Sequence, residues 1–207
     1  MKRPVSLVVF FASTSALFLS LTIAWTQVAA WTSYPVARIA QVVLDSNAPD
    51  WVEVTQITPQ QLRARTKFRQ ALPDGRVSTP IAGVDPAHYA YGISLFLALL
   101  IASRSQRLVR RATAGYCILL IPQAFSLILV LLGQIVREVP LEILGISVWQ
   151  ADAIMVGNMF GMIVLPTLAP VVLWLWFEGA FFRSLIAGLG LGVDSEAPSK
   201  ASWDVGF

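Results

Sequence analysis

Four long apolar stretches constrain the fold of this chain more than any other feature of its sequence. Residues 5–31, 86–103, 113–136 and 153–182 are long or apolar enough to cross a hydrocarbon core of about 30 Å. None has an Asp, Glu, Lys or Arg in its middle. Only 13% of all residues are charged, whereas about a quarter are charged in an ordinary soluble domain. We therefore expect an integral membrane protein with four transmembrane helices.

The second stretch, residues 86–103, is the shortest, and its flanks decide how it is interpreted. Its length is at the lower limit for a span, and alone it also fits a buried helix of a soluble protein. Residues 104–112, which follow, carry Arg104, Arg107, Arg110 and Arg111. Arginine clusters in a short link between two spans are typical of cytoplasmic loops. This favours a span for residues 86–103.

The same rule orients the chain in the membrane. A cytoplasmic link at residues 104–112 places both termini in the cytoplasm, in agreement with Lys2 and Arg3 near the start. Residues 32–85 and an interfacial loop at 137–152 then lie outside. The first of these outer segments also carries six basic residues, but five acidic ones offset them and most lie far from a span. We expect a multi-pass membrane protein, with residues 183–207 as a cytoplasmic tail.

The first stretch also has features of a cleaved signal peptide. Lys2 and Arg3, the apolar run and the small residues near Ala30 imitate its three regions. A signal peptide, however, has an apolar core of roughly 7–15 residues, and the run from residue 5 to residue 31 is much longer. We expect an uncleaved anchor.

Residues 32–85 have the pattern of a small folded module. Ser33 and Pro35 can start a short amphipathic helix, whose apolar residues recur at helical spacing. Residues 51–58 are rich in β-branched side chains and predict a strand, and Pro73-Asp74-Gly75 predicts a turn into a strand at 76–81. The predicted fold class is an all-α polytopic membrane protein with four transmembrane helices and a small α+β extracytoplasmic module between the first two.

A cluster of basic residues stands out inside this module. A capping box near Thr58 also allows a helix here. The cations, however, recur at every second position, so that a strand would place all of them on one face: Arg63, Arg65, Lys67 and Arg69. We predict a strand. Its charged face would either protect a sheet edge from aggregation or dock acidic protein segments or anionic lipid headgroups.

Few residues in the spans offer chemistry. Cys117 and His88 are each the only residue of their type. The predicted topology places them near opposite ends of their spans, so they are not expected to form a catalytic pair. No metal-binding cluster or nucleotide-binding glycine pattern is present in the sequence, and no cofactor is predicted.

The polar residues within the spans are amides, which ordinarily pack helices together by hydrogen bonding: Gln27, Gln123, Gln134 and Asn158. Pro122, Pro166 and Pro170 are expected to kink their helices. Gly157 and Gly161 flank Asn158 in a small-xxx-small pattern, which predicts a close helix-packing contact.

The order of these segments resembles a known family. An N-terminal anchor and a modest outer module precede "HYAYGISLFLALLIAS" and "RSQRLVRRATAGY", as in the small membrane proteins associated with exosortase H in Gram-negative bacteria. Exosortases themselves carry a Cys, an Arg and a His in that order. This chain departs from that order, because His88 precedes Cys117. The resemblance therefore implies the accessory protein and not the enzyme, and it transfers no site residues.

We therefore expect an accessory protein that lies in the lipid bilayer and binds or assists an exosortase-type protein-sorting enzyme or its substrates. A small transporter or channel subunit is the alternative, and an intramembrane enzyme that uses Cys117 is the least supported. Nucleic acid is not an expected partner. The possible docking surface is the basic face, and the possible packing contact is the group of Gly157, Asn158 and Gly161.

Overall fold

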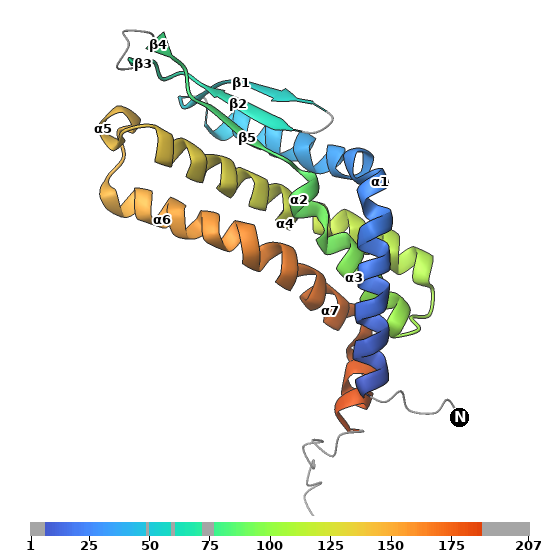
Figure 1. Ribbon diagram of the computed structural model, residues 1–207. Helices are drawn as coiled ribbons and strands as arrows, with labels where there is room; N and C mark the ends of the chain where they lie inside the picture. The colour runs from blue at the N-terminus through green and yellow to red at the C-terminus, as the bar shows by residue number, and fades with distance from the viewer. Residues whose placement is uncertain (1–6, 49, 59–60, 72–76, 188–207) are drawn as a thin grey trace, which may run out of the picture.

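The computed structural model describes residues 7–48, 50–58, 61–71 and 77–187. The helices are α1 (Leu7–Asn47), α2 (Ala87–Ala90), α3 (Gly92–Ala102), α4 (Leu108–Glu138), α5 (Leu141–Leu144), α6 (Val148–Met159) and α7 (Leu165–Ala187) (Figure 1). A π-helical segment, η1 (Phe160–Val164), connects α6 to α7. The strands are β1 (Val52–Ile57), β2 (Leu62–Thr66), β3 (Gln70–Ala71), β4 (Val77–Ser78) and β5 (Ile81–Val84).

Three helices are long and apolar enough to cross a membrane: α1, α4 and the continuous helix Val148–Ala187. They correspond to the first, third and fourth apolar stretches. The second stretch forms the shorter helical segment Ala87–Ala102. Its main part, α3, is largely buried, with Phe96, Ala98 and Leu100 fully so. Three candidate spans and a small sheet thus match the predicted class, while a fourth span remains a prediction.

Helix α1 corrects one expectation. We predicted that a separate helix begins at Ser33, but α1 continues without a break to Asn47. Ser33 does not cap a helix, because its hydroxyl donates to the carbonyl of Ala29, one turn earlier, at 2.6 Å. Pro35 lies inside the helix and lacks a backbone N–H, which accounts for the bend of α1 in Figure 1. Packing of the part after the bend offsets the lost hydrogen bond.

The sheet lies across the second part of α1 and across α4. Its strand order is β1-β2-β5, with both pairs antiparallel, and β3 and β4 form a separate two-stranded ribbon. The inner face buries Leu62, Ala64 and Val84 in one apolar cluster with residues of α1 and α4. Hydrogen bonds attach both edge strands of the sheet to the helices. Gln41 Nε2 of α1 donates to the Thr55 carbonyl of β1 at 3.0 Å, and the Gly83 N–H of β5 donates to Gln134 Oε1 of α4 at 3.0 Å.

A second cluster surrounds α3 at the other end of the molecule. Phe10 of α1 stacks on Trp174 of α7, with ring centroids 5.6 Å apart. The indole N–H of Trp174 donates to Ser103 Oγ, just after α3, at 3.4 Å. The beginning of α1, the end of α3 and the second half of α7 therefore meet at one end.

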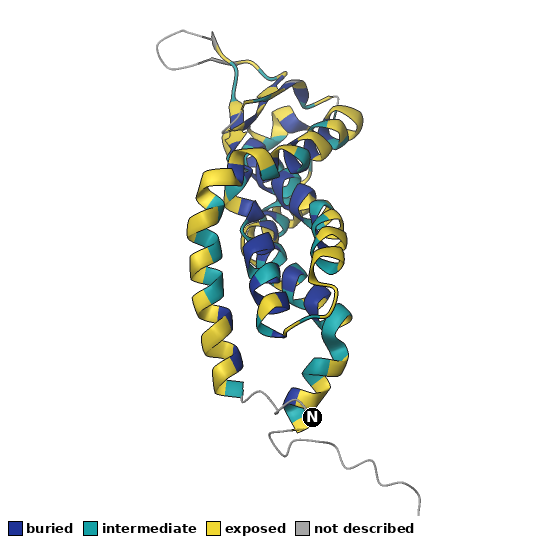
Figure 2. Ribbon diagram, turned by 90° about the vertical axis from the view of Figure 1, so that its right-hand side faces the viewer, coloured by how far each residue is buried: buried dark blue, intermediate teal, exposed yellow. Residues whose placement is uncertain are grey.

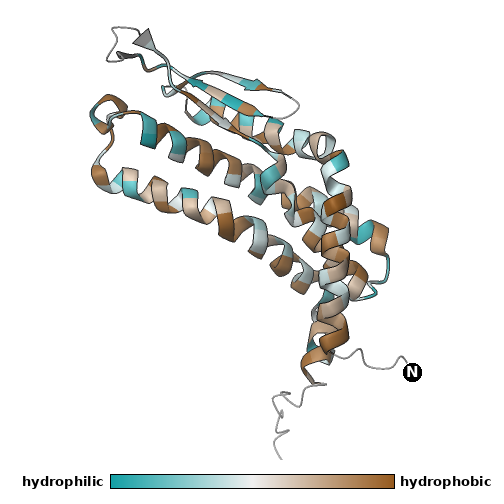
Figure 3. Cartoon of the chain, in the orientation of Figure 1, coloured by the Kyte–Doolittle hydropathy of each residue, from teal (hydrophilic) through white to brown (hydrophobic). Residues whose placement is uncertain are grey.

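Much of the long helices remains uncovered by protein. Only 11% of the most apolar window of α1 is buried, and Figure 2 shows this helix mainly in the colour of exposed residues. Figure 3 shows hydrophobic residues along α1 and α7 and hydrophilic ones on the sheet. Exposed apolar helices of this length are suited to a lipid environment.

Candidate functional site

Two of the four predicted cations, Arg63 and Arg65, lie on the outer face of the sheet. In β2 the side chains alternate between buried and exposed positions, so that Arg63 and Arg65 point away from the core. The predicted strand is confirmed over Leu62–Thr66 but ends there. Lys67 and Arg69 follow the strand and are also exposed. Of the four cations, only Arg63 and Arg65 are therefore held in strand geometry.

Arg63 and Arg65 border a hollow of about 210 Å³ together with Gln56 and Ile81. Gly83 lies opposite Arg63 on β5, and its missing side chain leaves room beside the arginine. The Nε of Arg63 donates to Gln61 Oε1 at 2.8 Å. This contact orients the guanidinium group and leaves its two terminal nitrogens available.

No carboxylate neutralises these cations within the part of the chain that the structure describes. The ion pairs found there are His88 with Asp85 and Arg111 with Glu178. Guanidinium groups bind carboxylates and phosphates through paired hydrogen bonds. The basic face can therefore bind an anionic group, and it lies on a sheet that two helices hold in place.

The predicted packing contact lies inside the molecule. Cβ atoms added at Gly157 and at Gly161 would lie 3.2 and 3.1 Å from side-chain atoms of Leu129 in α4. Asn158 is buried and packs where Gly133 of α4 leaves space. These residues thus lie against α4 of the same chain.

The remaining amides differ in their surroundings. Gln134 accepts a hydrogen bond from the sheet, whereas Gln27 is exposed. Gln123 is buried, and neither atom of its amide has a partner; the hydroxyl of Ser126 and Oδ1 of Asn158 are likewise buried without one.

Cys117 and His88 have separate environments. Cys117 is exposed on α4, and His88 in α2 lies 3.4 Å from the Asp85 carboxylate. The Tyr116 hydroxyl, next to Cys117, donates to the Thr32 carbonyl near the bend of α1 at 3.0 Å, so this part of α4 lies beside that bend. The positions of Tyr116 and Thr32 along their predicted spans do not indicate that the two residues are in contact.

Sequence reasoning missed the ion pair between Arg111 and Glu178. Glu178 lies where α7 departs from helical geometry, with φ −120° and ψ 28°, and only 11% of its side chain is exposed. Arg111 also donates to Ser105 Oγ at 2.9 Å. The signal was available, because Glu178 is the only acidic residue between positions 153 and 182.

A family model described as "Exosortase H-associated membrane protein" matches residues 4–181. The chain belongs to this family. Membership confirms the resemblance noted in the sequence, and it makes the chain a membrane protein associated with exosortase H. Among curated proteins and solved structures, nothing matches the chain.

Proposed function

We propose that this protein is an accessory protein of the bacterial inner membrane that binds exosortase H, or a substrate of that enzyme, through the basic face of its sheet. Four transmembrane helices, with both termini in the cytoplasm, would place this face on the outer side of the membrane. The protein itself would catalyse no reaction.

The observation that supports the proposal is the set of exposed cations without a carboxylate partner among the described residues. A sheet edge can be protected by one or two charges. Here, however, Arg63 and Arg65 lie in the central strand β2, which pairs with β1 on one side and β5 on the other. Edge protection therefore does not explain these two residues, and binding of an acidic partner does.

The test is co-purification of exosortase H, or of a tagged substrate, with the wild-type chain and with a variant in which all four cations are replaced by Gln (Arg63, Arg65, Lys67 and Arg69). Each exposed charge contributes only about 0–1 kcal/mol, so single substitutions should have little effect. The fourfold variant should recover much less partner. Added salt should weaken wild-type binding, because the Debye length is only about 8 Å at physiological ionic strength.

The matched control replaces the three arginines with Lys, which keeps the charge but removes the bidentate guanidinium geometry. If binding depends on charge alone, the Lys control should recover as much partner as the wild type. If binding also needs bidentate contacts, recovery should fall in both the Lys control and the fourfold Gln variant. Equal recovery of the partner by wild type and by the fourfold Gln variant at every salt concentration would refute the proposal.

A further inference from the structure

The hollow on the outer face of the sheet is formed by all three strands. Gln56 of β1 and Gly83 of β5 lie directly opposite Arg63 of β2, and Ile81 of β5 lies directly opposite Arg65. The side chains of the two arginines, of Gln56 and of Ile81 line one space of about 210 Å³. Strand pairing therefore brings two cations, one amide and one apolar side chain together at a single place.

The two arginines can direct their donors at one group in this hollow. Two residues along a strand are about 6–7 Å apart, which is within the reach of two arginine side chains. The bond from Arg63 Nε to Gln61 Oε1 leaves the two terminal nitrogens of that guanidinium group to donate side by side. Paired donors of this kind match the two oxygens of a carboxylate. The amide of Gln56, opposite Arg63, can add a further donor.

The hollow also has an apolar wall. Ile81 is 54% exposed, although it is a large hydrophobic residue. A small inorganic anion would leave this side chain in water, whereas the methylene groups of an acidic side chain would cover it. The volume of about 210 Å³ is below the roughly 300–1,000 Å³ of a site for a whole small molecule. The hollow therefore suits the end of one side chain of a larger partner.

We infer that this hollow binds the carboxylate of one acidic side chain of the protein partner. The carboxylate accepts hydrogen bonds from Arg63 and Arg65, and the methylene groups beside it lie against Ile81. Lys67 and Arg69 come after the end of β2 and are not among the residues that line the hollow, so they add only long-range attraction. The identity of the partner rests on the proposed function, but the carboxylate site belongs to the chain itself.

NMR titration of the full-length chain in zwitterionic detergent micelles, at constant ionic strength, tests the site without exosortase H. The probe is N-acetylglutamate methylamide, whose only charge is its side-chain carboxylate. The reference compound is N-acetylglutamine methylamide, which has nearly the same shape and no charge. The backbone amide signals of β2 and β5 should shift saturably with the probe and should not shift with the reference compound.

Two double variants separate the hollow from the rest of the basic face, because both remove two positive charges. Arg63→Gln combined with Arg65→Gln should raise the Kd for the probe about tenfold, which corresponds to about 1.4 kcal/mol. Lys67→Gln combined with Arg69→Gln should leave this Kd nearly unchanged.

A third variant fills the hollow and keeps every charge. A Cβ atom at Gly83 would lie 3.8 Å from Cγ of Arg63, an ordinary van der Waals distance, so Gly83→Ala should retain probe binding. The longer side chain of Gly83→Leu should occupy the space beside Arg63 and weaken binding. Thermal unfolding of both variants verifies the fold.

Equal increases in the Kd for the two double variants would show that the face attracts anions by its total charge alone, and would overturn the inference. Tighter binding of methyl phosphate than of the probe would also overturn it, in favour of a phosphate site.

The inference and the proposed function can fail separately. If the probe binds in the hollow while exosortase H co-purifies equally with the wild type and the fourfold Gln variant, the carboxylate site is supported and the proposed function is refuted. If the probe does not bind while the fourfold Gln variant loses exosortase H, only the carboxylate site is refuted.

Discussion

Among single residues, Gly115 and Phe96 show how closely α3 and α4 pack. Phe96 is fully buried, and its ring lies where a Cβ atom at Gly115 of α4 would stand. The absence of a side chain at Gly115 therefore allows α3 and α4 to approach each other. Amides and glycines in apolar helices indicate such contacts, but they do not indicate which helix is contacted.

We predict that Gly115→Ala lowers the free energy of unfolding by about 1–3 kcal/mol, the usual cost of overfilling a packed core. Thermal unfolding in detergent micelles measures this change. Gly179→Ala is the matched control, because its new Cβ would meet no atom within 4 Å. Combining Gly115→Ala with Phe96→Leu should recover part of the loss. Unchanged stability of Gly115→Ala would show that the two helices do not make this contact.

A second prediction at this scale concerns the only cysteine. Cys117 is exposed on α4, and no hydrogen bond from its thiol is found in the described structure. Cys117→Ser should therefore leave both stability and association with exosortase H largely unchanged, as measured by unfolding and by co-purification. A loss of function in this variant at a normal protein level would favour the Cys117 enzyme instead.

At the scale of elements, the ion pair between Arg111 and Glu178 joins the start of α4 to the irregular turn of α7. Glu178 is nearly buried, whereas about a third of the Arg111 side chain is exposed. Removing one partner leaves the other charge without compensation. The pair therefore connects two long helices, α4 and α7.

We expect Arg111→Gln and Glu178→Gln each to lower the free energy of unfolding, by on the order of 2 kcal/mol for a hydrogen bond between charged groups. The double variant should lose less than the sum of the two, because neither charge is then left unpaired. Unfolding of the four proteins in a double-mutant cycle gives the coupling energy. Arg110→Gln, an exposed neighbour, should be nearly neutral. Strict additivity would contradict a direct interaction.

At the scale of the whole molecule, the arrangement of the helix ends bears on membrane topology. Phe10, Ser103 and Trp174 meet at one end, and the sheet lies at the other (Figure 1). This is the arrangement that the proposed topology requires, with the N-terminus, the arginine-rich link and the end of α7 on one side. The sheet would then lie on the opposite side, in reach of an extracytoplasmic partner.

Reporter fusions test this topology directly. A reporter fused after Arg69 should be active only if it is one that works outside the cytoplasm. A reporter fused after Ala187 should be active only if it is one that works in the cytoplasm. The expected pattern follows from Arg104, Arg107 and Arg110, all exposed in the link or the first turn of α4, because such clusters remain in the cytoplasm. An outer location of the C-terminus would show that the chain does not cross the membrane four times.

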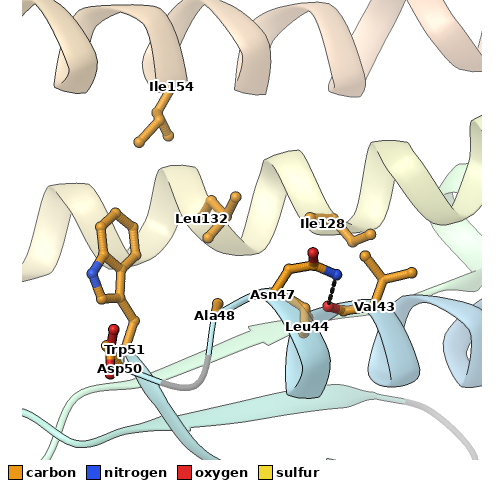
Figure 4. A pocket seen from close by; sticks show the side chains of 9 residues that line it. All are labelled: Val43, Leu44, Asn47, Ala48, Asp50, Trp51, Ile128, Leu132 and Ile154. Atoms are coloured by element: carbon orange, nitrogen blue, oxygen red, sulfur yellow. Dashed lines mark hydrogen bonds between the residues drawn. The ribbon is translucent and has the colours of Figure 1, made fainter.

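The apolar helices, the strand at Arg63 and Arg65 and the family could be predicted from the sequence. They follow from the length of an apolar run, the period of the charges and the order of the segments. The continuation of α1 through Pro35 could not be predicted, because it depends on tertiary contacts. Contacts of Val36, Ala40 and Leu44 with the sheet and α4 stabilise that part of the helix, and no local pattern contains them. The same holds for the partners of Arg111 and Asn158 and for the groove that Leu44 of α1, Leu132 of α4 and Ile154 of α6 line (Figure 4). Each joins residues far apart in the chain, and their proximity depends on how bent and tilted helices pack.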